Sequence, residues 1–313
     1  MRKDTIVKFK AFIGIIFIIA LYSWSQGQAD TDKDVAPEVY LNHLFVVVDS
    51  STYEDIVTSD FIKNEWAHFE ERTTVVGNNI SYTGAYIYGE NTYMEFFDSA
   101  KKPSSITPAL TSGIAFGVDK KGKFKVIQKK LKEYKNAVSY LGTWELEGTQ
   151  IPWYHAAFVF YGKAKRNIHT WIMEYHQDFL RKWHPELEPV SGGITRKDIL
   201  KRYAAKITKP LQPGRKIFKD IIGINLRVNK EEIEKITGEL DVFGYEMRQD
   251  GNRMIWHGPY IMLTIENTDE GEGRITGIEM RLNHNPHPKA SFKFGESSRL
   301  IFHEDKTASW IFH

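Results

Sequence analysis

Two short apolar segments, each carrying one side chain able to bind a metal, constrain this chain most. His43 lies in the run 40–49 and Glu95 in the run 92–97, where the neighbouring residues are mainly apolar. Burying an imidazole or a carboxylate in such a setting costs free energy unless a partner compensates. A metal ion is one such partner, and an ordinary hydrogen-bonding neighbour is another. Both explanations stay open for the two residues.

The order strand, helix, three strands recurs along the sequence. Turn residues and apolar periodicity predict the first copy from a strand at 40–49, a helix at 52–63, β-rich segments around a turn at 77–79 and a strand at 92–97. The second copy is predicted from a strand at 114–119, a helix at 124–134 and strands at 137–147, 153–160 and 167–175. The third is predicted from a strand at 221–228, a helix at 230–240 and strands at 243–248, 253–257, 260–266 and 274–282, before a hairpin at 291–312. A unit that cannot bury its own sheet face has to pair with another.

We therefore predict an α+β fold built from repeated βαβββ modules, with a third module and a C-terminal hairpin appended to the first pair. The predicted divisions are a signal peptide at 1–29, paired modules at 38–180, a bridging insert at 181–218 and the third module with its hairpin at 219–313. The insert is set apart by its prolines and glycines and by a short helix predicted near 197–205.

Composition excludes several classes of function. The formal net charge is only +2 and the charges are interspersed, so the chain lacks the basic patch expected of a nucleic-acid-binding protein. Cysteine is absent, which rules out disulfides, thiolate metal ligands and cysteine nucleophiles. A metal bound here would have nitrogen and oxygen ligands. The 313 residues are enough to bury a large core.

The N-terminal residues have the composition of an export signal. A basic start is followed by a short apolar stretch at 11–24 and by small residues suited to signal peptidase. The apolar stretch is shorter than the roughly 20 residues that span a bilayer, although an uncleaved anchor is the alternative. We expect a periplasmic or extracellular protein with no stable membrane span after cleavage of the signal.

The two opening segments resemble motifs of the vicinal oxygen chelate superfamily, which includes glyoxalases and extradiol dioxygenases. Asn42, His43 and Leu44, followed by valines and Asp49, are similar to its first-strand motif, and residues 93–97 are similar to its last-strand carboxylate motif. The resemblance implies two βαβββ modules that form a cupped sheet around a metal ion. The whole chain also looks like a bacterial exported protein.

The resemblance implies the metal ligands His43, Glu95 and Glu174, the last from the closing strand of the second module. Aligning Asp49 with Asp119 puts Gly113 at the place of His43, so a second histidine is missing from the set. The dioxygenases of the superfamily use two histidines and one carboxylate, and this chain departs from that plan.

One histidine and two carboxylates would suit a divalent ion of zinc, manganese, iron, nickel or magnesium, with coordination positions left for substrate. Such an ion would polarise a substrate oxygen or activate water, as in a metal-dependent lyase or a dioxygenase-like enzyme. His155 and His176, on neighbouring predicted strands, could complete the ligand set or support it, or could be ordinary histidines.

Aromatic side chains could line a pocket for a small-molecule ligand, or could simply belong to the core. The pocket candidates are Tyr86, Tyr88, Tyr93, Trp153, His155, Trp171 and His176. The sequence therefore favours an exported protein that binds or converts a small oxygenated molecule with a divalent metal. The alternatives are a binding protein on the same scaffold without metal or catalysis, and an envelope module that binds a partner protein.

Overall fold

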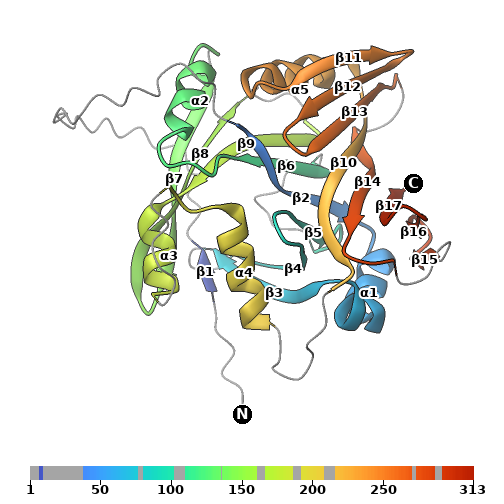
Figure 1. The fold of residues 1–313 in the computed structure, drawn as a ribbon, viewed down its shortest axis with the longest axis horizontal. Helices are drawn as coiled ribbons and strands as arrows, with labels where there is room; N and C mark the ends of the chain where they lie inside the picture. The colour runs from blue at the N-terminus through green and yellow to red at the C-terminus, as the bar shows by residue number, and fades with distance from the viewer. Residues whose placement is uncertain are drawn as a thin grey trace.

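A computed structural model describes residues 7–9, 38–76, 80–101, 110–134, 136–160, 166–185, 192–207, 216–269, 273–285 and 291–313. Within these residues the chain has mixed α+β structure, and its strands form two sheets of nine and eight strands (Figure 1). The predicted signal peptide falls outside the described residues, apart from the short strand β1 (Val7–Phe9).

The first sheet contains two βαβββ modules joined side by side. Module 1 consists of β2 (Tyr40–Val48), α1 (Ser50–Thr58), a π-helical turn (Ile62–Trp66), β3 (His68–Val76), β4 (Ile80–Tyr88) and β5 (Tyr93–Asp98). Module 2 consists of β6 (Ser112–Gly117), α2 (Phe124–Leu131), β7 (Ala137–Leu146), β8 (Thr149–Val159) and β9 (Ile168–Tyr175). The strand order is β1-β3-β4-β5-β2-β6-β9-β8-β7, with β2 and β6 antiparallel at the centre. The predicted pair of modules is present.

The first and last strands of each module are parallel neighbours. The helix after the first strand returns the chain to the end of the sheet at which that strand began, and the next three strands then lead back to its side. β2 pairs with β5 and β6 pairs with β9 in this way. Asp49 begins α1 by accepting a hydrogen bond from the Thr52 backbone N–H at 2.8 Å. The central strands are buried on both faces, which explains their nearly continuous apolar sequence.

The second sheet contains the third module and the C-terminal strands. Module 3 consists of β10 (Phe218–Val228), α5 (Lys230–Val242), β11 (Glu246–Asp250), β12 (Arg253–Gly258) and β13 (Ile261–Asn267). The chain ends with β14 (Arg274–Leu282), β15 (Ser291–Phe294), β16 (Ser298–Phe302) and β17 (Thr307–Phe312). Their order is β11-β12-β13-β10-β14-β17-β16-β15. The predicted hairpin is thus the three-stranded meander of β15, β16 and β17, which joins the sheet through the pairing of β17 with β14.

The two faces of the first sheet belong to different hydrophobic clusters. One face shares a core with α1, α2, α5 and the second sheet, where Phe96 packs on Trp310 with ring centroids 4.9 Å apart. The opposite face carries His43, Glu95 and Trp171, and we call it the cup face. Aromatic and aliphatic residues of the cup face cluster with α3 (Gln177–Trp183) and α4 (Arg196–Ile207). Figure 1 shows α4 lying across β3 and β4.

Two carboxylates, one half-buried and one buried, connect the second sheet to the first. Asp220 accepts hydrogen bonds from the backbone N–H groups of Asn91 and Thr92 at 2.6 and 3.1 Å. Glu232 accepts from the backbone N–H groups of Asn167 and Ile168 at 2.6 and 3.1 Å. These bonds fix the position of module 3 relative to both modules of the first sheet. No helix within the described ranges combines the length and the apolar content required to cross a membrane.

Candidate functional site

His43 lies at the centre of the cup face, enclosed by aromatic rings. Its ring stacks on Tyr93 with centroids 4.4 Å apart, and Trp171 meets it edge-on at 5.3 Å. Its Nδ1 lies 2.9 Å from the side-chain oxygen of Asn42. Because an amide oxygen can only accept, Nδ1 carries the proton and Nε2 is left with a free lone pair. Nε2 is therefore the atom that His43 offers to a ligand.

Glu95 shares this surface with His43. Its Oε1 lies 3.9 Å from Nε2 of His43, and the two side chains are only 14% and 10% exposed. Burial raises the pKa of the Glu95 carboxyl to about 7, although the Arg72 charge and the Tyr93 hydroxyl oppose the rise. Burial lowers the pKa of His43 to about 3. The imidazole is thus uncharged at neutral pH, so the pair is not an ion pair despite its short separation.

Glu174 does not join these two residues. Its carboxylate accepts hydrogen bonds from the backbone N–H groups of Gly122 and Phe124, each at 2.9 Å, at the start of α2. In the β8–β9 ladder it lies opposite His155, whose ring stacks on Phe124 of the same helix. Glu174 therefore points to the helix-covered face of the sheet, and its role is to cap α2.

Gly113 occupies the place of His43 in the second module, as the alignment of Asp49 with Asp119 predicts. In the β2–β6 ladder Gly113 lies opposite Phe45, whose ring covers it. A Cβ atom built on Gly113 would come within 2.2 Å of that ring. No side chain fits at this position, so the second module cannot supply a first-strand ligand.

The strand pairing identifies the true counterpart of Glu95. In module 1, Tyr93 of β5 pairs with His43 of β2. In module 2, His169 of β9 pairs with Gly113 of β6. Glu95 and Trp171 each lie two residues further along, so Trp171 stands where a second carboxylate would be. Glu174 is three residues beyond Trp171, and an odd offset along a strand moves a side chain to the other face.

These residues do not fit the metal that the resemblance implies. Among the described residues, no group of three or more histidine and carboxylate side chains is placed to hold an ion. Two of the four ligand positions are filled by the indole of Trp171 and by Gly113 beneath Phe45. Protein metal sites of this kind need at least three side-chain ligands. The arrangement leaves two hydrogen-bonding groups in an aromatic surround.

The predicted pocket residues divide into two groups. Tyr93 and Trp171 contact His43, and Tyr86 and Tyr88 extend the same aromatic surface along β4, with centroids 6.2 Å apart. The remaining candidates lie elsewhere: Trp153 packs on Phe179 of α3, His155 faces α2, and His176 caps α3 by accepting from the Asp178 backbone N–H. Only the first group can line the cup.

Three further residues lie in the cup, and two of them, Tyr203 and His169, were not predicted from the sequence. Arg72 of β3 places its guanidinium 4.2 Å from the Tyr86 ring centroid, and Tyr203 of α4 stacks on Tyr88 at 5.0 Å. His169 stacks on Trp171 at 5.4 Å, and burial lowers its pKa to about 3. Strand alternation with Trp171 could have identified His169, whereas the approach of α4 depends on tertiary packing.

Comparison with solved structures returns distant similarities. A hypothetical protein from Staphylococcus aureus aligns with a TM-score of 0.49 and 11% identity, covering 84% of this chain and 95% of that one. An extradiol ring-cleaving dioxygenase from B. fuscum aligns with a TM-score of 0.42 and 9% identity, covering 91% of this chain and 75% of the dioxygenase. Homoprotocatechuate 2,3-dioxygenase from Arthrobacter globiformis aligns with a TM-score of 0.42 and 8% identity, covering 87% of this chain and 78% of the enzyme. All three scores lie below 0.5, so the βαβββ modules are assigned from the strand pairing described above.

Sequence comparison places the chain in a family. No curated protein matches it. A family model matches residues 41–312, which span both sheets. The chain therefore belongs to the family described as a family of unknown function, DUF5829.

Proposed function

We propose that the cup binds a small, uncharged, oxygenated molecule with an apolar body, and that it does so without a metal ion. The observation that supports this most directly is the separation of 3.9 Å between His43 Nε2 and Glu95 Oε1 inside an aromatic surround. This distance is too long for a direct hydrogen bond, yet one hydroxyl group can reach both atoms.

The two polar groups have complementary roles toward such a hydroxyl. Nε2 of His43 accepts a hydrogen bond from the hydroxyl, because Asn42 holds the other ring nitrogen in its protonated form. The protonated form of Glu95 donates a hydrogen bond to the hydroxyl oxygen, whereas its ionised form has no proton to donate. Tyr93 and Trp171 supply apolar contact on two sides of the same point.

The electrostatics favour binding over acid–base catalysis by His43. A general base works best when its pKa lies near the working pH, and the pKa of His43 is lowered to about 3 by burial. The carboxyl of Glu95, with its pKa raised to about 7, will exchange a proton with ligand or solvent near neutrality. We infer that ligand affinity depends on the protonation state of Glu95.

Phenol titration of the full chain, followed by calorimetry, tests this proposal. The wild type should bind phenol saturably, while His43→Ala and Glu95→Leu each weaken binding by about tenfold, the loss of roughly one buried hydrogen bond. His257→Ala, at an exposed position of β12, is the matched control and should bind as the wild type does. Equal affinities in all four proteins would exclude the cup as the binding site.

Elemental analysis of the same preparations tests the absence of a metal. We expect zinc, manganese, iron and nickel well below one ion per chain, unchanged by His43→Ala. Stoichiometric metal that disappears in His43→Ala would overturn the metal-free proposal and restore the notion of an enzyme centre at His43 and Glu95.

We also propose that the chain is exported, because residues 1–29 combine a basic start, a short apolar stretch and small residues. Fusion of alkaline phosphatase after residue 37 should give activity outside the cytoplasm. Deleting residues 2–29 should abolish that activity, and activity that survives the deletion would contradict export through this segment.

A further inference from the structure

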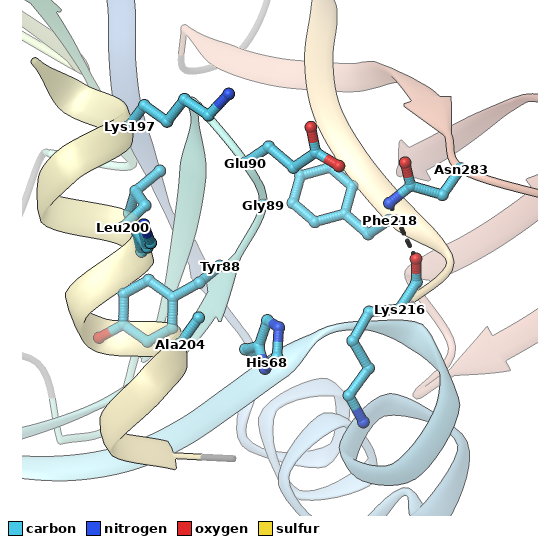
Figure 2. A pocket seen from close by; sticks show the side chains of 11 residues that line it. His68, Tyr88, Gly89, Glu90, Lys197, Leu200, Ala204, Lys216, Phe218 and Asn283 are labelled. Carbon is cyan, nitrogen blue, oxygen red and sulfur yellow. Dashed lines mark hydrogen bonds between the residues drawn. The ribbon is translucent and has the colours of Figure 1, made fainter. Parts of the chain in front are cut away.

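A second pocket lies between α4 and the second sheet, and Tyr88 of the cup's aromatic surface also lines it. It has a volume of about 230 Å³. Figure 2 shows α4 on one side, the turn after β4 on another, and the start of β10 with the end of β14 on the third. Tyr88, Leu200 and Phe218 are buried residues that form its apolar surface. His43 and Glu95 are not among its lining residues.

Positive charge is concentrated on the α4 side of this pocket. Lys197 and Lys201 lie one helical turn apart on α4, and both are exposed. Lys216 also lines the pocket, but its ammonium group donates to the backbone oxygens of Lys63 and Asn64 at 3.3 and 2.6 Å. The α4 lysines are therefore the cations that remain available to a ligand.

A buried acceptor lies on the opposite side. The side-chain nitrogen of Asn283 donates to the backbone oxygen of Lys216 at 3.0 Å, which fixes the orientation of its amide (Figure 2). The amide oxygen is buried and has no hydrogen-bond partner among the described residues. A buried acceptor without a partner costs free energy that a ligand donor would recover. Glu90, an acidic residue of the turn after β4, also lines the pocket.

We infer that this pocket binds a small organic anion that carries a hydroxyl group and an apolar body. The anionic group pairs with Lys197 and Lys201, the hydroxyl donates to the oxygen of Asn283, and the apolar body lies on Leu200 and Phe218. The volume suits a ligand of a few carbon atoms rather than a cofactor. The site is independent of the proposed function of the cup.

Hydroxyisocaproate is a suitable probe because it combines a carboxylate, a hydroxyl and a branched apolar group. Calorimetric titration of the full chain should show saturable binding. Isocaproate lacks the hydroxyl and hydroxyisocaproamide lacks the charge, and each should bind about tenfold more weakly. Raising the sodium chloride concentration should weaken hydroxyisocaproate but leave hydroxyisocaproamide unaffected, since exposed lysines are screened by salt. Equal affinity for the three probes, or no binding of hydroxyisocaproate, would refute the assignment.

Matched variants assign the binding to this pocket. Lys201→Met should weaken hydroxyisocaproate severalfold, whereas Lys130→Met, at an exposed lysine of α2, should not. Asn283→Leu should remove the advantage of hydroxyisocaproate over isocaproate. Asn285→Leu is its control, because Asn285 also donates to a backbone oxygen and has an unpartnered amide oxygen but does not line the pocket. Unchanged binding in both Lys201→Met and Asn283→Leu would show that the probe binds elsewhere.

Discussion

Asp98 and Glu174 occupy corresponding positions in the two modules, and each accepts hydrogen bonds at the start of its module's helix. Asp98 is the last residue of β5, opposite Val48, and accepts a hydrogen bond from the Ser50 hydroxyl at 2.7 Å. Glu174 accepts from two backbone N–H groups at the start of α2. The repeated acidic residue therefore serves the βα connection of each module, and this structural role accounts for its recurrence.

Replacing Glu174 tests that role. Glu174→Ala removes the acceptor for two backbone N–H groups at the start of α2, so the free energy of unfolding should fall by about 1 kcal/mol. Urea unfolding followed by circular dichroism measures the change. Glu133→Ala, at an exposed residue after the same helix, should change stability little. Equal effects of the two substitutions would show that the capping bonds contribute nothing.

The pKa of Glu95 predicts how stability varies with pH. Burial raises the pKa of the folded carboxyl to about 7, above the unfolded value near 4.5, so the folded chain binds the proton more tightly. Wild-type stability should therefore fall as pH rises from about 5 to 7 through ionisation of this group. Glu95→Gln removes the titrating group, so between pH 5 and 7 its free energy of unfolding should rise by on the order of 2 kcal/mol relative to that of the wild type. Denaturant unfolding at several pH values measures this, and a constant difference between the two proteins would contradict the assignment.

The contact between Gly113 and Phe45 predicts a severe packing defect. Gly113→Ala places a methyl group 2.2 Å from the Phe45 ring and should destabilise the fold by about 1–3 kcal/mol. Adding Phe45→Leu should recover part of this loss, because the smaller side chain leaves room. Gly192→Ala is the control, since no atom lies within 4 Å of a Cβ built there. Thermal unfolding of Gly113→Ala, Phe45→Leu, their double variant and Gly192→Ala measures the coupling; strict additivity would show that the two positions do not clash.

Substitutions of two adjacent glutamates of α5 should differ in their effect on stability. Glu232 is 1% exposed and accepts from the backbone N–H groups of Asn167 and Ile168, whereas the side chain of Glu231 is 68% exposed and pairs with Lys235. Glu232→Ala leaves two N–H groups without an acceptor and should cost about 2–4 kcal/mol. Glu231→Ala should cost less than about 0.5 kcal/mol. Hydrogen exchange at Asn167 and Ile168 should accelerate only in Glu232→Ala, and protection that persists there would count against the role of Glu232.

Much of the fold could be predicted from periodicity and turn residues. The predicted helix at 230–240 corresponds to α5 (Lys230–Val242), and the predicted strand at 274–282 corresponds to β14 (Arg274–Leu282). These segments have caps or strict alternation that specify their structure locally. The helix α3 was not predicted, because its apolar residues Phe179 and Leu180 face a cluster assembled from distant strands.

The site was harder to predict than the fold. His43 and Glu95 come together because β2 and β5 are parallel neighbours, which the βαβββ pattern implies. The third ligand depends on the register of β9. The sequence predicts Glu174, near the end of this strand, as the counterpart of Glu95, whereas the strand pairing gives that place to Trp171. Sequence spacing alone does not distinguish the two faces at the end of a strand when both carry polar residues.

The ring of Phe45 over Gly113 has an evolutionary consequence. A histidine cannot be introduced at Gly113 by one substitution, because the overlap must first be relieved by a smaller residue at position 45, and that intermediate would contain a void. Both orders of substitution pass through a less stable protein. A two-histidine centre in this chain would therefore require coupled changes on two neighbouring strands.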